Sequence, residues 1–245
     1  MELAQFLVEN GADATAQDKY MSTPLHWVSP SSSGHADLGL FLMERGADAT
    51  AQNKDGWTPL HDASCRGHVD LARLLIEHGA NATAQTNHGY TPLHGASYYG
   101  YVDLARLLIE NGADTTSKHQ NGWTPLCSSL VKGHVEVARL LVEHGADTTT
   151  QAKEGSAPLH IVSRGGLVEA TRFLVEHGAD VTARKKDGST PLHMASRGGH
   201  LRVARVLLRH GADPAARDDL NRTPYDVVAL GRGYRSIIRL LSVEP

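Results

Sequence analysis

One short stretch of the sequence, residues 55–80, gathers side chains that could do chemistry. It reads DGWTPLHDASCRGHVDLARLLIEHGA and contains His61, Asp62, Cys65, His68 and Asp70. Imidazole, carboxylate and thiol groups bind metal ions and transfer protons, and a thiolate is a nucleophile. Taken alone, the stretch would predict a catalytic or metal-binding site. That prediction depends on whether the pattern occurs once or recurs along the chain.

The pattern recurs along the whole chain. The tetrapeptide TPLH begins at Thr23, Thr58, Thr91 and Thr190, with variants at Thr124 (TPLC), Ala157 (APLH) and Thr223 (TPYD). The first two starts are 35 residues apart and all later ones are 33 residues apart. The nine residues VDLARLLIE even occur identically at 69–77 and 102–110. Because a catalytic site is built once, this periodicity favours a structural role for most of the reactive side chains.

A 33-residue period that carries TPLH and GAD motifs resembles the ankyrin repeat, and the resemblance covers essentially the whole chain. The wording GADATAQNKDGWTPLH is also similar to arrays of fungal multidomain proteins. The resemblance implies an all-α solenoid of helix–turn–helix units with β-hairpin fingers. We expect a single ankyrin-repeat domain over 1–245, made of a half unit at 1–17, full units at 18–52, 53–85, 86–118, 119–151, 152–184 and 185–217, and a C-terminal capping unit at 218–245.

The residues of one repeat predict its two helices. The Thr58 hydroxyl can cap the first helix, and Pro59 fits the first helical position, where its missing N–H is no loss. This helix should end near Gly67, and the second should begin around Val69. The second helix has only three polar residues, spaced on one narrow stripe. Its remaining surface must be buried, so neighbouring repeats must stack on both sides of it.

Most histidines also follow the period. The resemblance implies that the motif histidine hydrogen-bonds to the motif Thr and to nearby backbone, which fixes the finger; this series is His26, His61, His94, His160 and His193. Others follow a glycine or close the second helix, which leaves His88 and His119 in fingers. Cys65 is not periodic, and no second pair of ligands joins it and His61 at a metal. We therefore expect no catalytic residue, no metal and no cofactor, and predict that the chain is not an enzyme.

The composition of the chain narrows the classes of function that remain possible. The chain has 245 residues and a formal net charge of -3, which disfavours a dedicated nucleic-acid binder. Two cysteines do not make a disulfide framework, so we expect an intracellular protein, cytoplasmic or nuclear. No apolar run approaches the roughly 20 residues that cross a bilayer, so we expect no membrane partner.

Three places depart from the repeat. Residues 29–37 (SPSSSGHAD) hold two extra residues and predict a lengthened, polar loop between helices. The last unit, with TPYDVV, resembles the closing repeat of natural arrays. The start, MELAQFLVENGAD, matches a second helix without its first helix, which leaves Leu3, Phe6, Leu7 and Val8 with an uncovered flank. We expect a fragment of a longer protein, or another covering for that end.

The residue just before the motif Thr is aromatic in three consecutive repeats, as Trp57, Tyr90 and Trp123. The resemblance implies that this position lies at the base of the finger and faces the concave groove. With packed helices about 10 Å apart, the three rings would span about 20 Å. That length suits about six residues of extended peptide or about 13 of helix. The alternative is that each ring only packs on the neighbouring finger.

We therefore predict a non-catalytic scaffold, a monomer that binds an unidentified protein or peptide in the groove. Its predicted anchors are the three aromatic residues, extended by Tyr98 and Tyr99; the residues predicted to adjust specificity are Asp55, Asp62, Arg66 and Lys132.

Two alternatives stay open. Nucleic-acid or nucleotide binding would use the groove aromatics and the basic end of the chain, where residues 184–245 hold 12 basic and 6 acidic residues against 12 and 21 in residues 1–183. The aromatics and the basic residues lie in different repeats, which disfavours it. The array could also be the targeting module of a larger enzyme or signalling protein.

Two losses predict a weaker segment. Ala157 removes a helix cap worth about 1 kcal/mol, and Cys127 replaces the motif histidine. We expect residues 119–184 to open first, which amide hydrogen exchange would detect as lower protection there. Uniform protection across all repeats would contradict this prediction.

Overall fold

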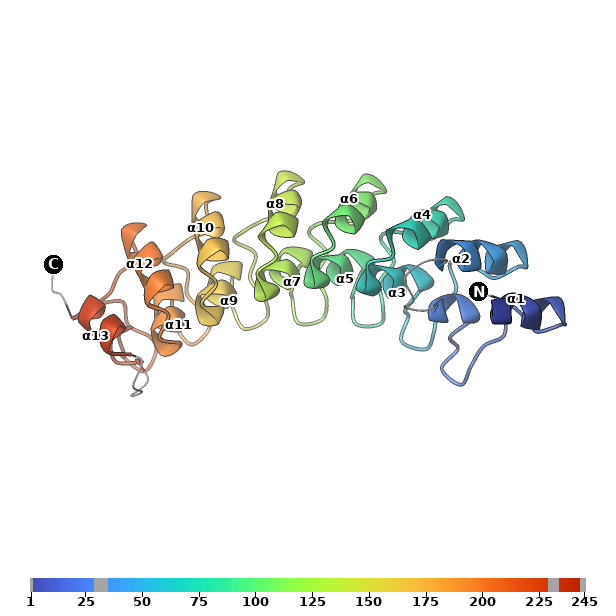
Figure 1. The fold of residues 1–245 in the computed structure, drawn as a ribbon. Coiled ribbons are helices and arrows are strands. Elements are labelled where there is room, and N and C mark those ends of the chain that lie inside the picture. The colour runs from blue at the N-terminus through green and yellow to red at the C-terminus, as the bar shows by residue number, and fades with distance from the viewer. Residues whose placement is uncertain (1, 29–34, 229–233, 243–245) are drawn as a thin grey trace. The chain divides into compact units, whose positions relative to one another are not determined.

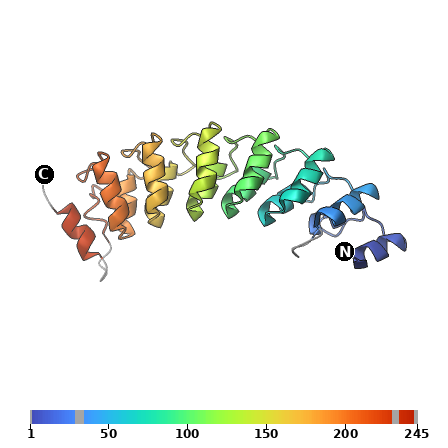
Figure 2. The same ribbon diagram turned by 45° about the horizontal axis from the view of Figure 1, so that its top comes forward.

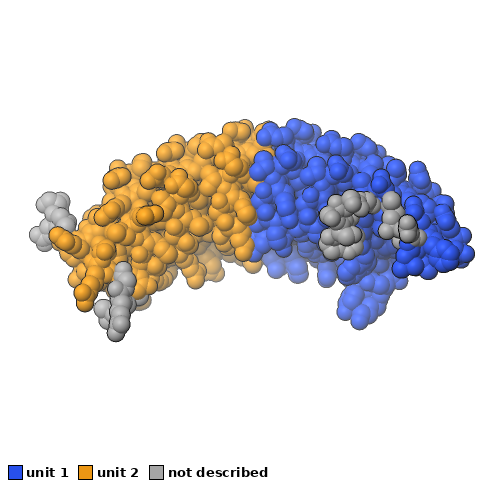
Figure 3. Space-filling view, viewed as in Figure 1, with its two compact units in different colours: residues 1–120 blue, residues 121–245 orange. Residues whose placement is uncertain are grey.

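The computed structural model describes residues 2–28, 35–228 and 234–242, and these residues form helices and turns. They group into two compact units, residues 1–120 and residues 121–245 (Figure 3). The helices of the first unit are α1 (Glu2–Glu9), the 3-10 helix η1 (Pro24–Trp27), α2 (His35–Glu44), α3 (Pro59–Arg66), α4 (Val69–Glu77), α5 (Pro92–Tyr99) and α6 (Val102–Glu110). Those of the second unit are α7 (Pro125–Lys132), α8 (Val135–Glu143), α9 (Pro158–Gly165), α10 (Val168–Glu176), α11 (Pro191–Arg197), α12 (Leu201–Arg209) and α13 (Arg235–Leu241).

In each unit the helices form two rows (Figure 1). The first helices of the repeats make one row, in which α3 packs between η1 and α5, and α9 packs between α7 and α11. The second helices make the other row, in which α4 packs between α2 and α6, and α10 between α8 and α12 (Figure 2). The turns that connect successive repeats, here called fingers, extend from the row of first helices. This stacking confirms the predicted all-helical repeat array.

The predicted helix boundaries are confirmed in the repeat that begins at residue 53. α3 begins at Pro59 and ends at Gly67, whose φ of +78° is the left-handed conformation that stops a helix. α4 begins at Val69. Thr58 and His61 form a capping box, in which the Thr58 side chain faces the backbone N–H of His61 and the His61 ring accepts from the N–H of Thr58. At α5, Thr91 accepts a hydrogen bond from the N–H of His94 in the same way.

In four repeats the motif histidine forms a hydrogen bond to the next finger. The N–H of Thr58 donates to Nδ1 of His61 at 3.1 Å, so the ring proton sits on Nε2, which donates to the carbonyl of Tyr90 at 3.0 Å. The same bond joins His26 to Trp57, His160 to Ser189, and His193 to Arg222. All four rings are buried, and burial lowers their pKa, to about 4 for His61. These histidines are therefore neutral at neutral pH and act as structural bridges.

The fingers are hydrogen-bonded turns, and the described residues contain no β-strand. In the finger of residues 53–57, the N–H of Asn53 donates to the carbonyl of Trp57, and Asn53 Oδ1 accepts from two further N–H groups. Neighbouring fingers touch, since the N–H of Asn87 donates to the carbonyl of Asp55 at 2.9 Å. These bonds are too few for a β-ladder, so the fingers differ in this respect from the expected β-hairpins. Gly56 permits the close approach, because its φ is +78° and a Cβ there would lie 3.0 Å from the Asn87 nitrogen.

The two terminal repeats are less regular. In the repeat at 18–52 the first helix is only η1, and most of the predicted loop at 29–37 lies outside the described residues. In the last repeat, described up to residue 228 and again from 234, residues 223–228 form a turn and not a helix. Asp226 stands at the motif histidine position there, and its carboxylate accepts bonds from the N–H and hydroxyl of Thr223. On α1, Leu3, Phe6 and Leu7 are exposed as predicted, whereas Val8 is half-buried.

The segment predicted to be weak has two altered links. At Cys127 the Thr124 hydroxyl donates to Sγ at 3.6 Å, so a thiol stands where four other repeats have the imidazole that bonds to the next finger. At Ala157 the backbone N–H still donates to His160, but no side chain caps α9. Both altered links lie in the second unit.

Restoring these links should stabilise the protein. We expect Cys127→His and Ala157→Thr each to raise the free energy of unfolding by about 1 kcal/mol, because one recovers a buried hydrogen bond and the other a helix cap. Urea denaturation followed by circular dichroism measures the change. The matched control, His193→Cys, should lower stability by a similar amount, and a neutral or destabilising Cys127→His would contradict this account.

Candidate protein-binding surface

Four of the predicted partner-binding residues line one pocket of the first unit. Asp55, Trp57, Asp62 and Arg66 surround a hollow of about 250 Å³ together with Ser22, His26, Trp27 and Asn53. The finger supplies Asp55 and Trp57, and α3 supplies Asp62 and Arg66. The pocket therefore lies on the face formed by the fingers and the first helices, here called the finger face.

The two aromatic anchors of the first unit stack on each other. The rings of Trp57 and Tyr90 lie 5.6 Å apart with an interplanar angle of 29°. Each also packs on the motif histidine of its own repeat, Trp57 on His61 and Tyr90 on His94. Both side chains remain half-buried. Both rings thus pack on their neighbours, and Trp57 also lines the pocket. Contact of these rings with a partner stays a prediction.

The surroundings of Asp62 disfavour the charged form of its carboxylate. Burial raises its pKa to about 6, although the Arg66 guanidinium, 3.9 Å away, acts in the opposite direction. A long ion-pair distance leaves this charge poorly compensated. A carboxylate that costs stability and borders an open pocket is a common mark of a functional position.

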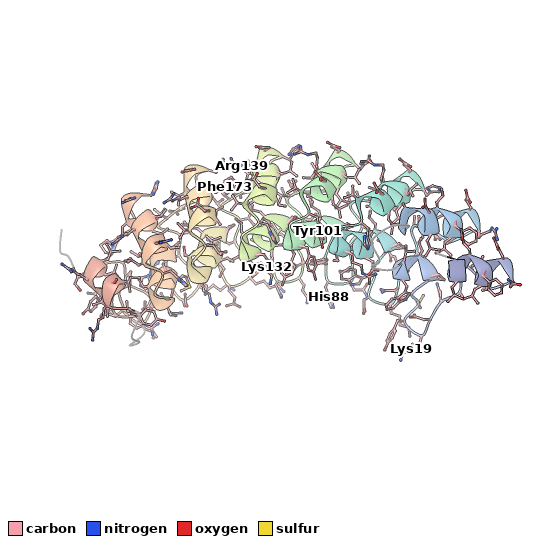
Figure 4. All side chains as sticks on the ribbon, viewed as in Figure 1. Lys19, His88, Tyr101, Lys132, Arg139 and Phe173 are labelled. Atoms are coloured by element: carbon pink, nitrogen blue, oxygen red, sulfur yellow. The ribbon has the colours of Figure 1, made fainter. Side chains whose placement is uncertain are left out.

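Tyr98 and Tyr99 extend the aromatic cluster at the end of α5. Their rings meet edge to face at 5.0 Å, and the Tyr99 ring stacks on Tyr101 at 6.1 Å. Tyr99 is exposed and Tyr98 is half-buried. Burial raises the pKa of the Tyr90 hydroxyl, and the nearby Cys65, Tyr98 and Tyr99 raise it further. These three side chains therefore lie close enough to Tyr90 to interact with it electrostatically. In Figure 4, His88 projects from the finger edge of the same unit.

The remaining two predicted residues belong to the second unit. Trp123 is half-buried and lines a pocket of about 600 Å³ with Ile161, Met194 and several charged residues. Lys132 is exposed at the end of α7 and is not among the residues that line this pocket (Figure 4). On the other row of helices, the Arg139 guanidinium lies 5.4 Å from the centre of the Phe173 ring.

The sequence prediction missed a second variable position. Trp27, Asp62, Ile161 and Met194 each follow the motif histidine directly, and all four line a pocket of the finger face. Only Asp62 was predicted. Trp27 is 61% exposed, which makes it the most accessible tryptophan of the described pockets. The signal was present in the sequence, because this position varies from repeat to repeat whereas the histidine before it recurs.

The chemistry suggested by residues 55–80 finds no support in the geometry. Burial raises the pKa of the Cys65 thiol to about 12, so the thiol stays protonated and is a poor nucleophile. Cys65 is half-buried against α5, where a Cβ added at Gly95 would lie 2.8 Å from Sγ. Both ring nitrogens of His61 form hydrogen bonds, one with the N–H of Thr58 and one with the carbonyl of Tyr90. Among the described residues no group of three His, Cys, Asp or Glu side chains could hold a metal ion.

The family model described as ankyrin repeats (3 copies) matches residues 1–85, 25–119, 112–185, 149–218 and 182–244. The chain belongs to the ankyrin repeat family. No curated protein sequence matches this ankyrin array. Its helices, in the described ranges, include none that is both long and apolar enough to cross a membrane.

Solved ankyrin domains share the fold. The human ASB11 ankyrin repeat domain is 25% identical, with a TM-score of 0.83, and the match covers 91% of this chain and 100% of that domain. The ankyrin repeat domain of Bcl-3, described as a unique member of the IkappaB protein family, is 30% identical, with a TM-score of 0.72, and the match covers 88% and 98% of the two chains. Ankyrin repeats are generally non-catalytic protein–protein interaction modules.

The raised pKa of Asp62 predicts how the free energy of unfolding depends on pH. The Asp62 carboxyl binds its proton more tightly in the folded state than in the unfolded chain, so ionised Asp62 destabilises the fold. This destabilisation is absent below the ordinary pKa of 3.8, grows as the pH rises towards about 6, and is complete above about 6. We expect Asp62→Asn to stabilise the protein by about 1 to 3 kcal/mol at about pH 7.5 and by less than half as much at about pH 4.5.

Thermal or urea denaturation at both pH values checks this. The control is Asp70→Asn, which removes an exposed carboxylate from α4 of the same repeat. Its effect at about pH 7.5 should be smaller than that of Asp62→Asn, because an exposed carboxylate keeps its hydration. A destabilising Asp62→Asn at neutral pH would show that the Arg66 pair outweighs burial.

Proposed function

We propose that this ankyrin array is a non-catalytic scaffold that binds a partner protein or peptide on its finger face. The observation that carries the proposal is the pocket of the first unit, where half-buried Trp57 and exposed Trp27 flank the poorly compensated carboxylate of Asp62. Aromatic side chains anchor protein interfaces because they bury much area for little loss of conformational entropy. A donor group of a partner would relieve the cost of Asp62.

The stacked rings support the same proposal. Trp57 and Tyr90 are held by packing and by the bonds that fix their backbone carbonyls, so their positions are set before a partner arrives. A preorganised anchor loses little freedom on binding, and this favours affinity. Tyr99 adds a further exposed ring at the end of α5.

In the second unit the proposal assigns Trp123 to the same role. It lines the larger pocket there. Lys132, at the exposed end of α7, is proposed to adjust specificity from outside that pocket. We expect Arg66 and Asp55 to tune the choice of partner in the first unit, because charges at the edge of an interface affect specificity and association rate more than affinity.

The aromatic anchors are tested by replacement. We expect Trp57→Ala/Tyr90→Ala/Trp123→Ala to abolish partner binding, a loss of at least about 100-fold in affinity, because each removed anchor accounts for roughly 1 to 2 kcal/mol. Affinity capture with the unaltered chain supplies partners, and isothermal titration with each purified partner measures the loss. The far-ultraviolet circular dichroism should stay nearly unchanged.

The control variant removes two exposed tyrosines that line neither pocket, as Tyr20→Ala/Tyr225→Ala. It should bind as the unaltered chain does. If a purified partner binds the triple variant normally, the site is wrong; if both variants lose binding equally, the loss is not specific to the three aromatic anchors.

A further inference from the structure

The finger face of the second unit carries a groove whose chemistry differs from that of the first unit. Two hollows, of about 600 and 330 Å³, share Arg164, Lys185 and Met194, so they form one groove, here called the second-unit groove. Trp123, Ile161 and Met194 give it apolar area. Ile161 is half-buried and Met194 is almost fully buried, so apolar surface lines the floor.

The groove repeats the same residue types in consecutive repeats. Ile161 and Met194 both follow the motif histidine, and Arg164 and Arg197 both stand three residues further on in α9 and α11. Since α9 and α11 pack side by side, each type forms a short row across the two repeats. A glycine follows each arginine, and both glycines, Gly165 and Gly198, line the groove.

Positive charge surrounds the apolar floor. The residues that line the groove include four cations, Lys153, Arg164, Lys185 and Arg197, and one carboxylate, Glu154. None of the four cations forms an ion pair with any residue in the described ranges. Asp187 lies close enough to Lys185 and Arg197 that they help to lower its pKa, so it offsets part of the charge. The balance remains positive, and both arginines are exposed.

We infer that the second-unit groove binds an acidic peptide segment that carries apolar side chains. The apolar side chains would cover Ile161 and Met194, and the flanking carboxylates would meet Arg164 and Arg197 with charge-assisted hydrogen bonds. Because packed helices lie about 10 Å apart and an extended chain advances about 3.3 Å per residue, the matching side chains would recur about every third residue. The inference rests on the proposed function, since it names the chemistry of a ligand for the finger face of one unit.

Nucleic acid fits this groove less well. Single-stranded nucleic acid needs several aromatic faces on which successive bases stack. Among the described lining residues, Trp123 is the only Trp, Tyr or Phe. The combination of apolar floor and cationic edges therefore favours a peptide.

The test uses a fluorescein-labelled peptide of about nine residues in which Leu stands at every third position among Glu and Asp. Fluorescence anisotropy with the full chain should show saturable binding that weakens as salt rises. Arg164→Gln/Arg197→Gln should weaken binding at least about tenfold, because both carboxylate contacts are lost. Lys153→Gln, a single exposed change, should weaken it by a smaller factor.

The matched control is Arg172→Gln/Arg205→Gln, which removes the same charge from exposed positions of α10 and α12 in the same two repeats. It should bind within about twofold of the unaltered chain. A peptide with Gln and Asn in place of the acids, and one with Ser in place of Leu, should both bind weakly. Trp57→Ala/Tyr90→Ala, which tests the first-unit pocket separately, should keep full affinity for the acidic peptide.

Several results would overturn the inference. These are no binding of the acidic peptide, equal losses in the test and control arginine variants, or equal binding of the peptide that lacks Leu. Tighter binding of a labelled oligouridylate than of the peptide would assign the groove to nucleic acid. Any of these results leaves the proposed function of the first-unit pocket standing, because that pocket has its own variants and its own readout.

Discussion

The bond from a buried histidine to the next finger is the interaction on which the finger face depends. His26 holds the carbonyl of Trp57, and His61 holds that of Tyr90. The residues whose rings form the first-unit anchors are therefore the residues whose backbone the bridges fix. A buried hydrogen bond of this kind contributes only about 1 kcal/mol, but leaving its partners unsatisfied costs more. The bridge thus sets the geometry of the face as well as the order of the fingers.

This arrangement separates the residues that build the array from the residues that recognise a partner. The motif Thr and His are buried and recur, whereas the positions directly before and after them reach the pockets. Asp62 and Ile161 occupy the same place in two repeats and give one a carboxylate and the other an apolar side chain. Because the bridges do not involve these side chains, the face can change its chemistry from repeat to repeat while the helices keep their places.

The fold could be predicted from the sequence because its determinants are local and repeated. Pro59 and Gly67 mark the ends of α3, and the apolar surface of α4 requires neighbours. The fingers were expected as β-hairpins, but their few hydrogen bonds make turns. The candidate site could be predicted only in part. Residue types pointed to Trp57 and Asp62, whereas the burial that raises the pKa of Asp62 depends on packing.

Other features of the site depend on contacts between repeats, which no single repeat reveals. The space for the Cys65 sulfur exists because α5 has Gly95 opposite it, one repeat later in the sequence. The second-unit groove requires that Arg164 and Arg197 follow each other across packed helices and that a glycine stands beside each. Trp27, Ile161 and Met194 occupy the same position in different repeats, and the variation at that position is visible only when equivalent residues of all repeats are compared.

The altered link at Cys127 has a mechanical consequence. When a stacked array is pulled along its length, the load passes from repeat to repeat through helix packing and through the histidine bridges. The step from α7 to α9 carries a thiol where the other steps carry an imidazole. Within the second unit, the contact between α7 and α9 should therefore break at the lowest force. The chain would then lengthen by one repeat at a time, while the first-unit anchors keep their positions relative to each other.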